Sequence, residues 1–175
     1  MKKSKTYKIV WSGVFIALGI VLPFLTGQIQ SIGNKLLPMH LPILICGFVC
    51  GAPYGLAAGL IVPLLRSVLF GMPPMFPTAV SMAFELCVYG WVTGFLYKKL
   101  PKKTSMTYAA LLIAMIAGRV VAGAVNAVLY GIQGSGYSMQ MFMAGMFLNA
   151  IPGIILQLIL VPAVVILLRK AKVMD

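Results

Sequence analysis

The chain has 175 residues, of which 61% are hydrophobic and only 9% are charged. Soluble domains carry about 25% charged residues, so this composition indicates an integral membrane protein with a single transmembrane domain over residues 1–175. The formal net charge is +12, but the basic residues do not form the aromatic-interleaved patch that is typical of a nucleic-acid-binding protein.

Most of the basic residues flank apolar segments. Cytoplasmic loops of membrane proteins are enriched in Lys and Arg, and anionic lipids attract these residues. Both termini and the loop near residue 100 are therefore predicted to be cytoplasmic. Three clusters hold eleven of the fourteen Lys and Arg residues: Lys2, Lys3, Lys5 and Lys8; Lys98, Lys99, Lys102 and Lys103; and Arg169, Lys170 and Lys172.

The pattern of apolar runs predicts an all-α protein with six transmembrane helices. The second and third runs have only 14 to 17 residues, or about 21–26 Å of helix, against a hydrocarbon core of about 30 Å. We expect these two segments to be short or irregular. The six predicted segments are approximately 8–26, 39–52, 55–71, 75–97, 105–130 and 139–168.

The first segment follows four lysines and lacks a small-residue cleavage site, so we expect a retained helix and not a cleaved signal peptide. It carries Gly13 and Ala17 four residues apart, a spacing that lets another helix approach closely. That helix can belong to a partner protein or to the same bundle.

A polar loop follows at residues 27–38 and is predicted to lie outside the cell. His40 comes next, at the mouth of the second segment. A single histidine at this position is either a hydrogen-bonding group near the membrane interface or a contact for a ligand.

Arg66 and Glu85 lie in consecutive apolar segments, separated by the turn at residues 71–74. An ionised side chain costs from about 2.5 to more than 10 kcal/mol in hydrocarbon, so neither is expected to face lipid. Tyr89 lies one helical turn beyond Glu85 on the same face. This region is the first candidate for a polar site inside the membrane.

The fifth and sixth segments also carry polar stripes. Arg119 and Asn126 are seven residues apart, which is close to two full turns of helix, so they share one face. Asn149 and Gln157 are eight residues apart on the last segment, again on one face. These four residues join the candidate site.

Two interpretations of these polar residues remain open. In the first, an arginine holds the carboxylate or phosphate of a small molecule, with uncharged polar side chains beside it. In the second, Arg66 reaches outward to the interface while Glu85 and Arg119 pair to lock two helices together.

Enzyme chemistry is disfavoured. Intramembrane proteases and phosphate-transfer enzymes need paired carboxylates, a Ser/His set or an HExxH metal site, and the chain has one histidine, one intramembrane carboxylate and no such pairing. The three cysteines, Cys46, Cys50 and Cys87, lack the further ligands of a metal site and are expected to pack in the interior. No cofactor or metal is predicted. Rings or relays of ionisable groups, as in channels and pumps, are not evident in the sequence.

The architecture, together with residues 36–97 and above all the run from LPMHLPILICG to GMPPMFPTAVSMAFELCVYGW, resembles the substrate-binding S components of energy-coupling factor vitamin transporters. The resemblance implies a multi-pass protein of the bacterial cell membrane that binds one vitamin or vitamin precursor. It also implies partners: a transmembrane coupling protein and two cytoplasmic ATPases, which supply the energy. In this family the spacing of Gly13 and Ala17 serves docking on the coupling protein.

The resemblance also implies a class of substrate. For the binding pocket it nominates Glu85, Asn126 and Asn149, and it leaves Arg119 and Gln157 deeper. An intramembrane arginine favours an anionic ligand, and the turn GMPPMFP is most similar to members assigned to pantothenate-like compounds; riboflavin is the alternative within the family. Outside the family, the alternative is a membrane assembly or interaction protein. The predicted substrate-binding residues are His40, Arg66, Glu85, Tyr89, Arg119, Asn126 and Asn149.

Overall fold

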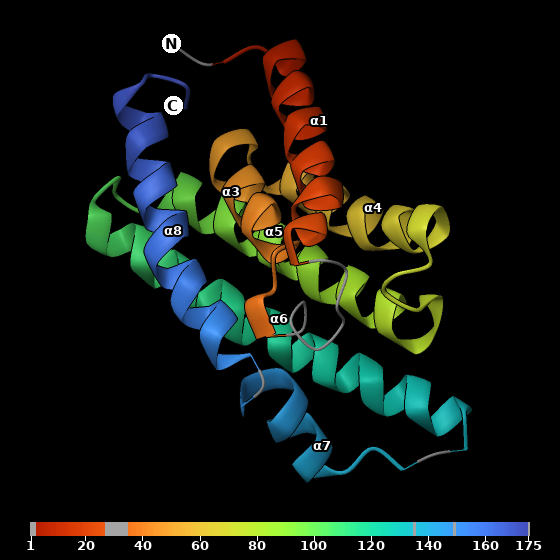
Figure 1. Ribbon diagram of the computed structural model, residues 1–175. Coiled ribbons are helices and arrows are strands. Elements are labelled where there is room, and N and C mark those ends of the chain that lie inside the picture. Colours follow the sequence, from red (N-terminus) through yellow and green to blue (C-terminus); the bar gives the residue numbers. More distant parts are fainter. Residues whose placement is uncertain (1–2, 27–34, 135, 149, 175) are drawn as a thin grey trace.

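The protein is a bundle of helices (Figure 1). The computed structural model describes residues 3–26, 35–134, 136–148 and 150–174, and these residues form helices and no strands. The all-α prediction is therefore confirmed. The α-helices are α1 (Lys5–Val21), α3 (His40–Cys50), α4 (Ala52–Phe70), α5 (Val80–Lys99), α6 (Thr104–Ile132), α7 (Met139–Met143) and α8 (Ile151–Lys170); shorter turns form η1 (Leu22–Thr26), η2 (Met75–Ala79) and η3 (Ala144–Leu148).

In the described part of the chain, five stretches of helix are long and apolar enough to cross a membrane. They comprise α1 with part of η1, α4, η2 with α5, α6, and α8. The second predicted segment is the 11-residue helix α3, whose length of about 17 Å is well short of the hydrocarbon core. The expectation of a short second segment is confirmed, whereas the third segment, α4, has an ordinary length of 19 residues.

Helix α3 lies at the centre of the bundle (Figure 1). Every one of its residues except Leu41 is buried, and it contacts α1, α4, α5 and α8. A short helix is tolerated at membrane depth when protein surrounds it, because no polar backbone end then faces lipid. The position of α3 brings its first residue, His40, into the protein interior.

Glycines set the spacing of α3, α4 and α5. Gly55 of α4 and Gly90 of α5 face each other so closely that a Cβ atom on either one would overlap the backbone of the other. The same is true of Gly59 against Leu86, and of Gly94 against the backbone at the start of α4. Small residues at such crossings let helix backbones touch, which is the main source of packing energy between helices in lipid.

The basic residues gather at one end of the bundle. The Lys3 ammonium donates to the Lys172 carbonyl at 2.7 Å, and the Tyr7 hydroxyl donates to the Val173 carbonyl at 2.8 Å. The Arg169 guanidinium donates to the carbonyl of Lys102 in the loop between α5 and α6. The two termini and this loop therefore share one side, as the distribution of Lys and Arg predicts for a cytoplasmic face.

The predicted sixth segment is not one continuous helix. The region of about 139–168 is divided into α7, η3 and the long helix α8, which begins only at Ile151. Pro152 lies in the first turn of α8, where its missing N–H is not needed and its fixed φ suits the start of a helix. The prediction of a single span over this region is wrong in its first dozen residues.

Replacement of Gly90 by Ala should separate α4 from α5. The added methyl group has no space against the Gly55 backbone, so we expect a loss of about 2–3 kcal/mol of unfolding free energy, measured by thermal unfolding in detergent. Gly131→Ala, in α6 with no atom within 4 Å of the added Cβ, is the matched control and should leave stability unchanged or slightly higher. Equal unfolding temperatures for the two variants would contradict this account of the packing.

Candidate functional site

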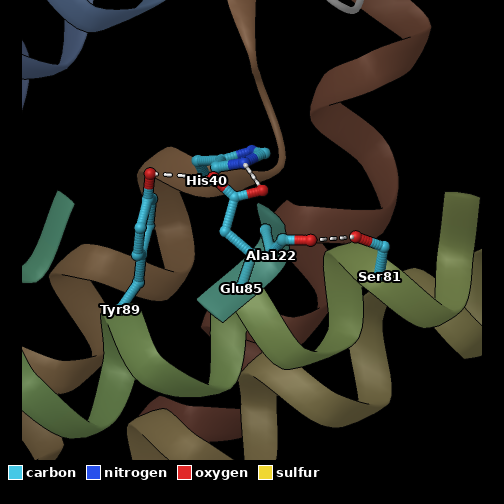
Figure 2. A network of polar contacts seen from close by, with 5 residues as sticks. All are labelled: His40, Ser81, Glu85, Tyr89 and Ala122. Atoms are coloured by element: carbon cyan, nitrogen blue, oxygen red, sulfur yellow. Dashed lines mark hydrogen bonds and ion pairs between the residues drawn. The ribbon is translucent and has the colours of Figure 1, made fainter. Parts of the chain in front are cut away.

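A stripe of four polar residues runs along the buried face of α5. Ser81, Glu85, Tyr89 and Thr93 are each four residues apart and all are buried. The Ser81 hydroxyl donates to the Ala122 carbonyl of α6 at 3.4 Å, and the Thr93 hydroxyl donates to the Tyr89 carbonyl at 2.7 Å. Figure 2 shows Ser81, Glu85 and Tyr89 pointing to the same side of α5.

Glu85 is the centre of this stripe. Its side chain is 6% exposed, and it accepts a hydrogen bond of 2.9 Å from the Tyr89 hydroxyl, as the shared face predicts. Nε2 of His40 lies 3.7 Å from the other carboxylate oxygen, a distance suited to an ion pair when the imidazole is protonated (Figure 2). The edge of the His40 ring also meets the Tyr89 ring, with centroids 5.6 Å apart.

Helix α6 brings the second charge to this cluster. Arg119 is 3% exposed and interacts electrostatically with both Glu85 and Tyr89. The adjacent Gly118 has no side chain, and the Tyr89 ring occupies the space that its Cβ would need. Arg119 therefore acts electrostatically on the Glu85 carboxylate.

Asn126 and Tyr137 extend the site away from the basic end. Asn126 lies on the same buried face of α6 as Arg119, and its side chain interacts with the hydroxyl of Tyr137 in the loop after α6. The Tyr137 ring stacks on Tyr130 at a centroid distance of 5.3 Å. Burial raises the pKa of the Tyr137 phenol, so this group is a neutral hydrogen-bonding side chain at physiological pH.

Arg66 belongs to a different environment. Its Nη1 atom donates to the Ile20 carbonyl near the end of α1 at 2.6 Å, and its guanidinium lies 4.8 Å from the Phe24 ring centroid and 5.5 Å from that of Phe70. The carbonyls at a helix end lack partners within the helix, so Arg66 satisfies one of them. The structure shows it linking α1 to α4, with no contact to the Glu85 cluster within the described residues.

The other predicted residues fall into three groups. Gly13 and Ala17 are exposed on α1, and nothing lies within 4 Å of a Cβ placed on Gly13. Gln157 is completely buried in α8. Asn149 lies outside the described residues.

Two residues of the site were missed by the sequence analysis. Ser81 lies four residues before Glu85, just as Tyr89 lies four residues after it. The four-residue spacing that predicted Tyr89 on the same helix face as Glu85 could therefore have predicted Ser81 as well. Tyr137 lies in a Gly/Ser-rich loop with no periodicity, and only the fold brings it to Asn126.

The chemistry of the cluster suits binding. It offers a carboxylate, a guanidinium, an imidazole, phenols and an amide, which together recognise charged and polar groups of a small molecule. The described residues contain no group of three or more His, Cys, Asp or Glu side chains placed to hold a metal ion.

A sequence model of one protein family matches residues 7–165 of the chain. Its description is "ECF transporter, substrate-specific component". Neither the curated proteins nor the solved structures include a significant match. The matched range covers α1 to most of α8, and so includes every described residue of the polar cluster.

Removal of the Tyr89 hydroxyl should weaken the cluster. Tyr89→Phe deletes the donor to the buried Glu85 carboxylate, and hydrogen bonds to charged groups contribute about 1.5–3 kcal/mol. We expect a loss of unfolding free energy of this size, measured by thermal unfolding in detergent. Tyr108→Phe, on the exposed side of α6, is the matched control and should be neutral; a neutral Tyr89→Phe would show that the carboxylate does not need this donor.

Proposed function

Because the chain belongs to the family of substrate-specific components of energy-coupling factor (ECF) transporters, we propose that it binds an anionic vitamin or vitamin precursor, with pantothenate as the best candidate. Proteins of this family are the substrate-binding subunits of ECF importers and are not enzymes. We further propose that the protein lies in a bacterial cell membrane and delivers its ligand to an ECF module with a coupling protein and two ATPases.

The observation that carries the proposal is the convergence of His40, Glu85 and Arg119 from three helices inside an apolar bundle. Buried charges are costly in hydrocarbon and mark substrate pathways in membrane proteins. A guanidinium binds a carboxylate through two parallel hydrogen bonds, which gives both affinity and geometric selectivity. We assign this role to Arg119, with Tyr89, Asn126 and Asn149 as uncharged partners.

The charge balance of the cluster suits an anionic ligand when His40 is protonated. With His40 neutral, the formal charges of Glu85 and Arg119 cancel. With His40 protonated and paired to Glu85 across 3.7 Å, the cluster carries one net positive charge. A ligand carboxylate neutralises that charge, so pantothenate fits the second state. Arg66 was also expected to bind substrate, but its contacts with Ile20 and two Phe rings support a structural role instead.

The exposed face of α1 supports the proposed association with the coupling protein. Inside the bundle, α1 is approached closely at Gly19, whose Cβ would meet Val62 of α4. Gly13 and Ala17 take no part in that packing, because both are exposed. The small residues on the outer face are therefore free to receive a helix of another protein.

The proposal predicts one bound small molecule per chain. Thermal unfolding of the detergent-purified protein should be measured against a panel of vitamins and precursors that includes pantothenate and riboflavin. A ligand at 100 times its dissociation constant stabilises the fold by about 2.7 kcal/mol, and native mass spectrometry gives its stoichiometry. A flat panel with no co-purified mass contradicts the proposal and favours a membrane assembly protein.

Two arginine variants serve as the internal control for this experiment. Arg119→Met should abolish the shift caused by pantothenate, whereas Arg66→Met should lower the unfolding temperature of the free protein and keep the shift. The reverse result would assign substrate binding to Arg66.

A second prediction concerns docking. Ala17→Leu should leave the ligand-induced thermal shift unchanged but prevent co-purification with the ECF module, since the larger side chain keeps the partner helix away. Ala127→Leu, the same change at an exposed position of α6, is the control and should keep assembly intact. Normal assembly of Ala17→Leu would show that the coupling protein binds another face.

A further inference from the structure

One buried side chain of α8 has no hydrogen bond to the part of the chain that the structure describes. Gln157 has a relative exposure of 0%, and neither its amide nitrogen nor its amide oxygen has a partner among the described residues. Most buried polar groups in proteins are paired, and each exception needs an explanation. In a membrane protein the cost is higher, because water is scarce at this depth.

The buried face of α8 around Gln157 is otherwise apolar. The buried stripe of α8 consists of Gly153, Gln157, Val161 and Val165, each four residues apart, and Gln157 is its only member with a polar side chain. Leu or Met at this position would continue the apolar stripe and fill a similar volume. The presence of an amide here is therefore not explained by packing within the described chain.

Helix α8, which carries Gln157, packs against α3, which carries His40 of the polar cluster. Gly153 lies against the backbone of Lys35 and Leu36, since a Cβ there would overlap the Lys35 carbonyl. From this point α8 and α3 ascend side by side (Figure 1), and Gln157 lies one turn beyond Gly153. Helix α3 begins with His40, whose Nδ1 atom is also buried without a partner among the described residues.

We propose that Gln157 is a specificity-determining residue that hydrogen-bonds an amide or imide group of the ligand, an inference that rests on the proposed function. A primary amide offers one acceptor and two donors, which match the N–H and C=O of a secondary amide or an imide. Pantothenate contains such an amide besides its carboxylate, and riboflavin contains an imide. The ligand would then be held at two points, its anionic group by Arg119 and its amide by Gln157.

This assignment predicts opposite effects on stability and on binding. Gln157→Met removes an unsatisfied buried amide, so the ligand-free protein should unfold about 2–4 °C higher than the wild type. The same variant should bind pantothenate at least 10-fold more weakly, because the ligand amide then has no partner. Gln133→Met, at an exposed position after α6, is the matched control and should change neither quantity.

The decisive experiment compares two ligands on two proteins by thermal shift and calorimetry. Wild type should prefer pantothenate over its ester analogue, which lacks the amide N–H, by about 10-fold, and Gln157→Met should lose that preference. If the panel selects riboflavin, its N3-methyl derivative replaces the ester. Gln157→Leu is a second variant in case Gln157→Met does not fold.

Each outcome supports or overturns the proposed role of Gln157. Unchanged affinity and preference in Gln157→Met overturn this inference and leave the proposed function intact. A wild-type protein that binds no member of the panel overturns the proposed function, and this inference with it. A lower unfolding temperature for ligand-free Gln157→Met and Gln157→Leu, or failure of both to fold, shows that the amide has a partner in the protein and also overturns the inference.

Discussion

The backbone contact between α4 and α5 at Gly55 and Gly90 is the constraint on which the rest of the structure depends. Apolar side chains gain little by leaving lipid for protein, so helices in a membrane are held by close packing. The contact leaves no space for a Cβ atom on either residue. Once α4 and α5 touch along this line, the neighbouring face of α5, about 100° around the helix, turns toward α3 and α6. That face carries Glu85 and Tyr89.

The burial of Glu85 explains why polar groups from three helices meet. A carboxylate in hydrocarbon requires either a countercharge or several hydrogen bonds. Tyr89 supplies a hydrogen bond from the same helix, His40 supplies a potential cation from α3, and Arg119 acts from α6. The short helix α3 is essential to this arrangement, because a longer helix would carry residue 40 toward the membrane surface instead of the interior.

The sequence predicts the class of fold, the sidedness of the termini and most of the polar cluster, since each depends on local composition or on spacing within one helix. The pairing of Glu85 with Tyr89 is of this kind, and so is the shared face of Arg119 and Asn126. Contacts between helices cannot be predicted from local composition or spacing in this way. The position of Arg66 between Phe24 and Phe70 depends on how α1 meets α4, and the break before α8 depends on local geometry around Pro152; neither follows from hydrophobic periodicity.

Helix α8 is packed less closely than α3, α4 and α5, which carry most of the polar cluster. Helices α3, α4 and α5 share close backbone contacts at glycines, and Arg66 and Gly19 bind α1 to the same unit. Helix α8 contacts only α3 and α6 extensively among the described helices, and much of its surface is exposed. His40 and Glu85 belong to the glycine-packed helices α3 and α5, so this close packing fixes the geometry of the pair. Helix α8 can adjust at a lower cost than the glycine-packed helices, because fewer of its contacts must be broken.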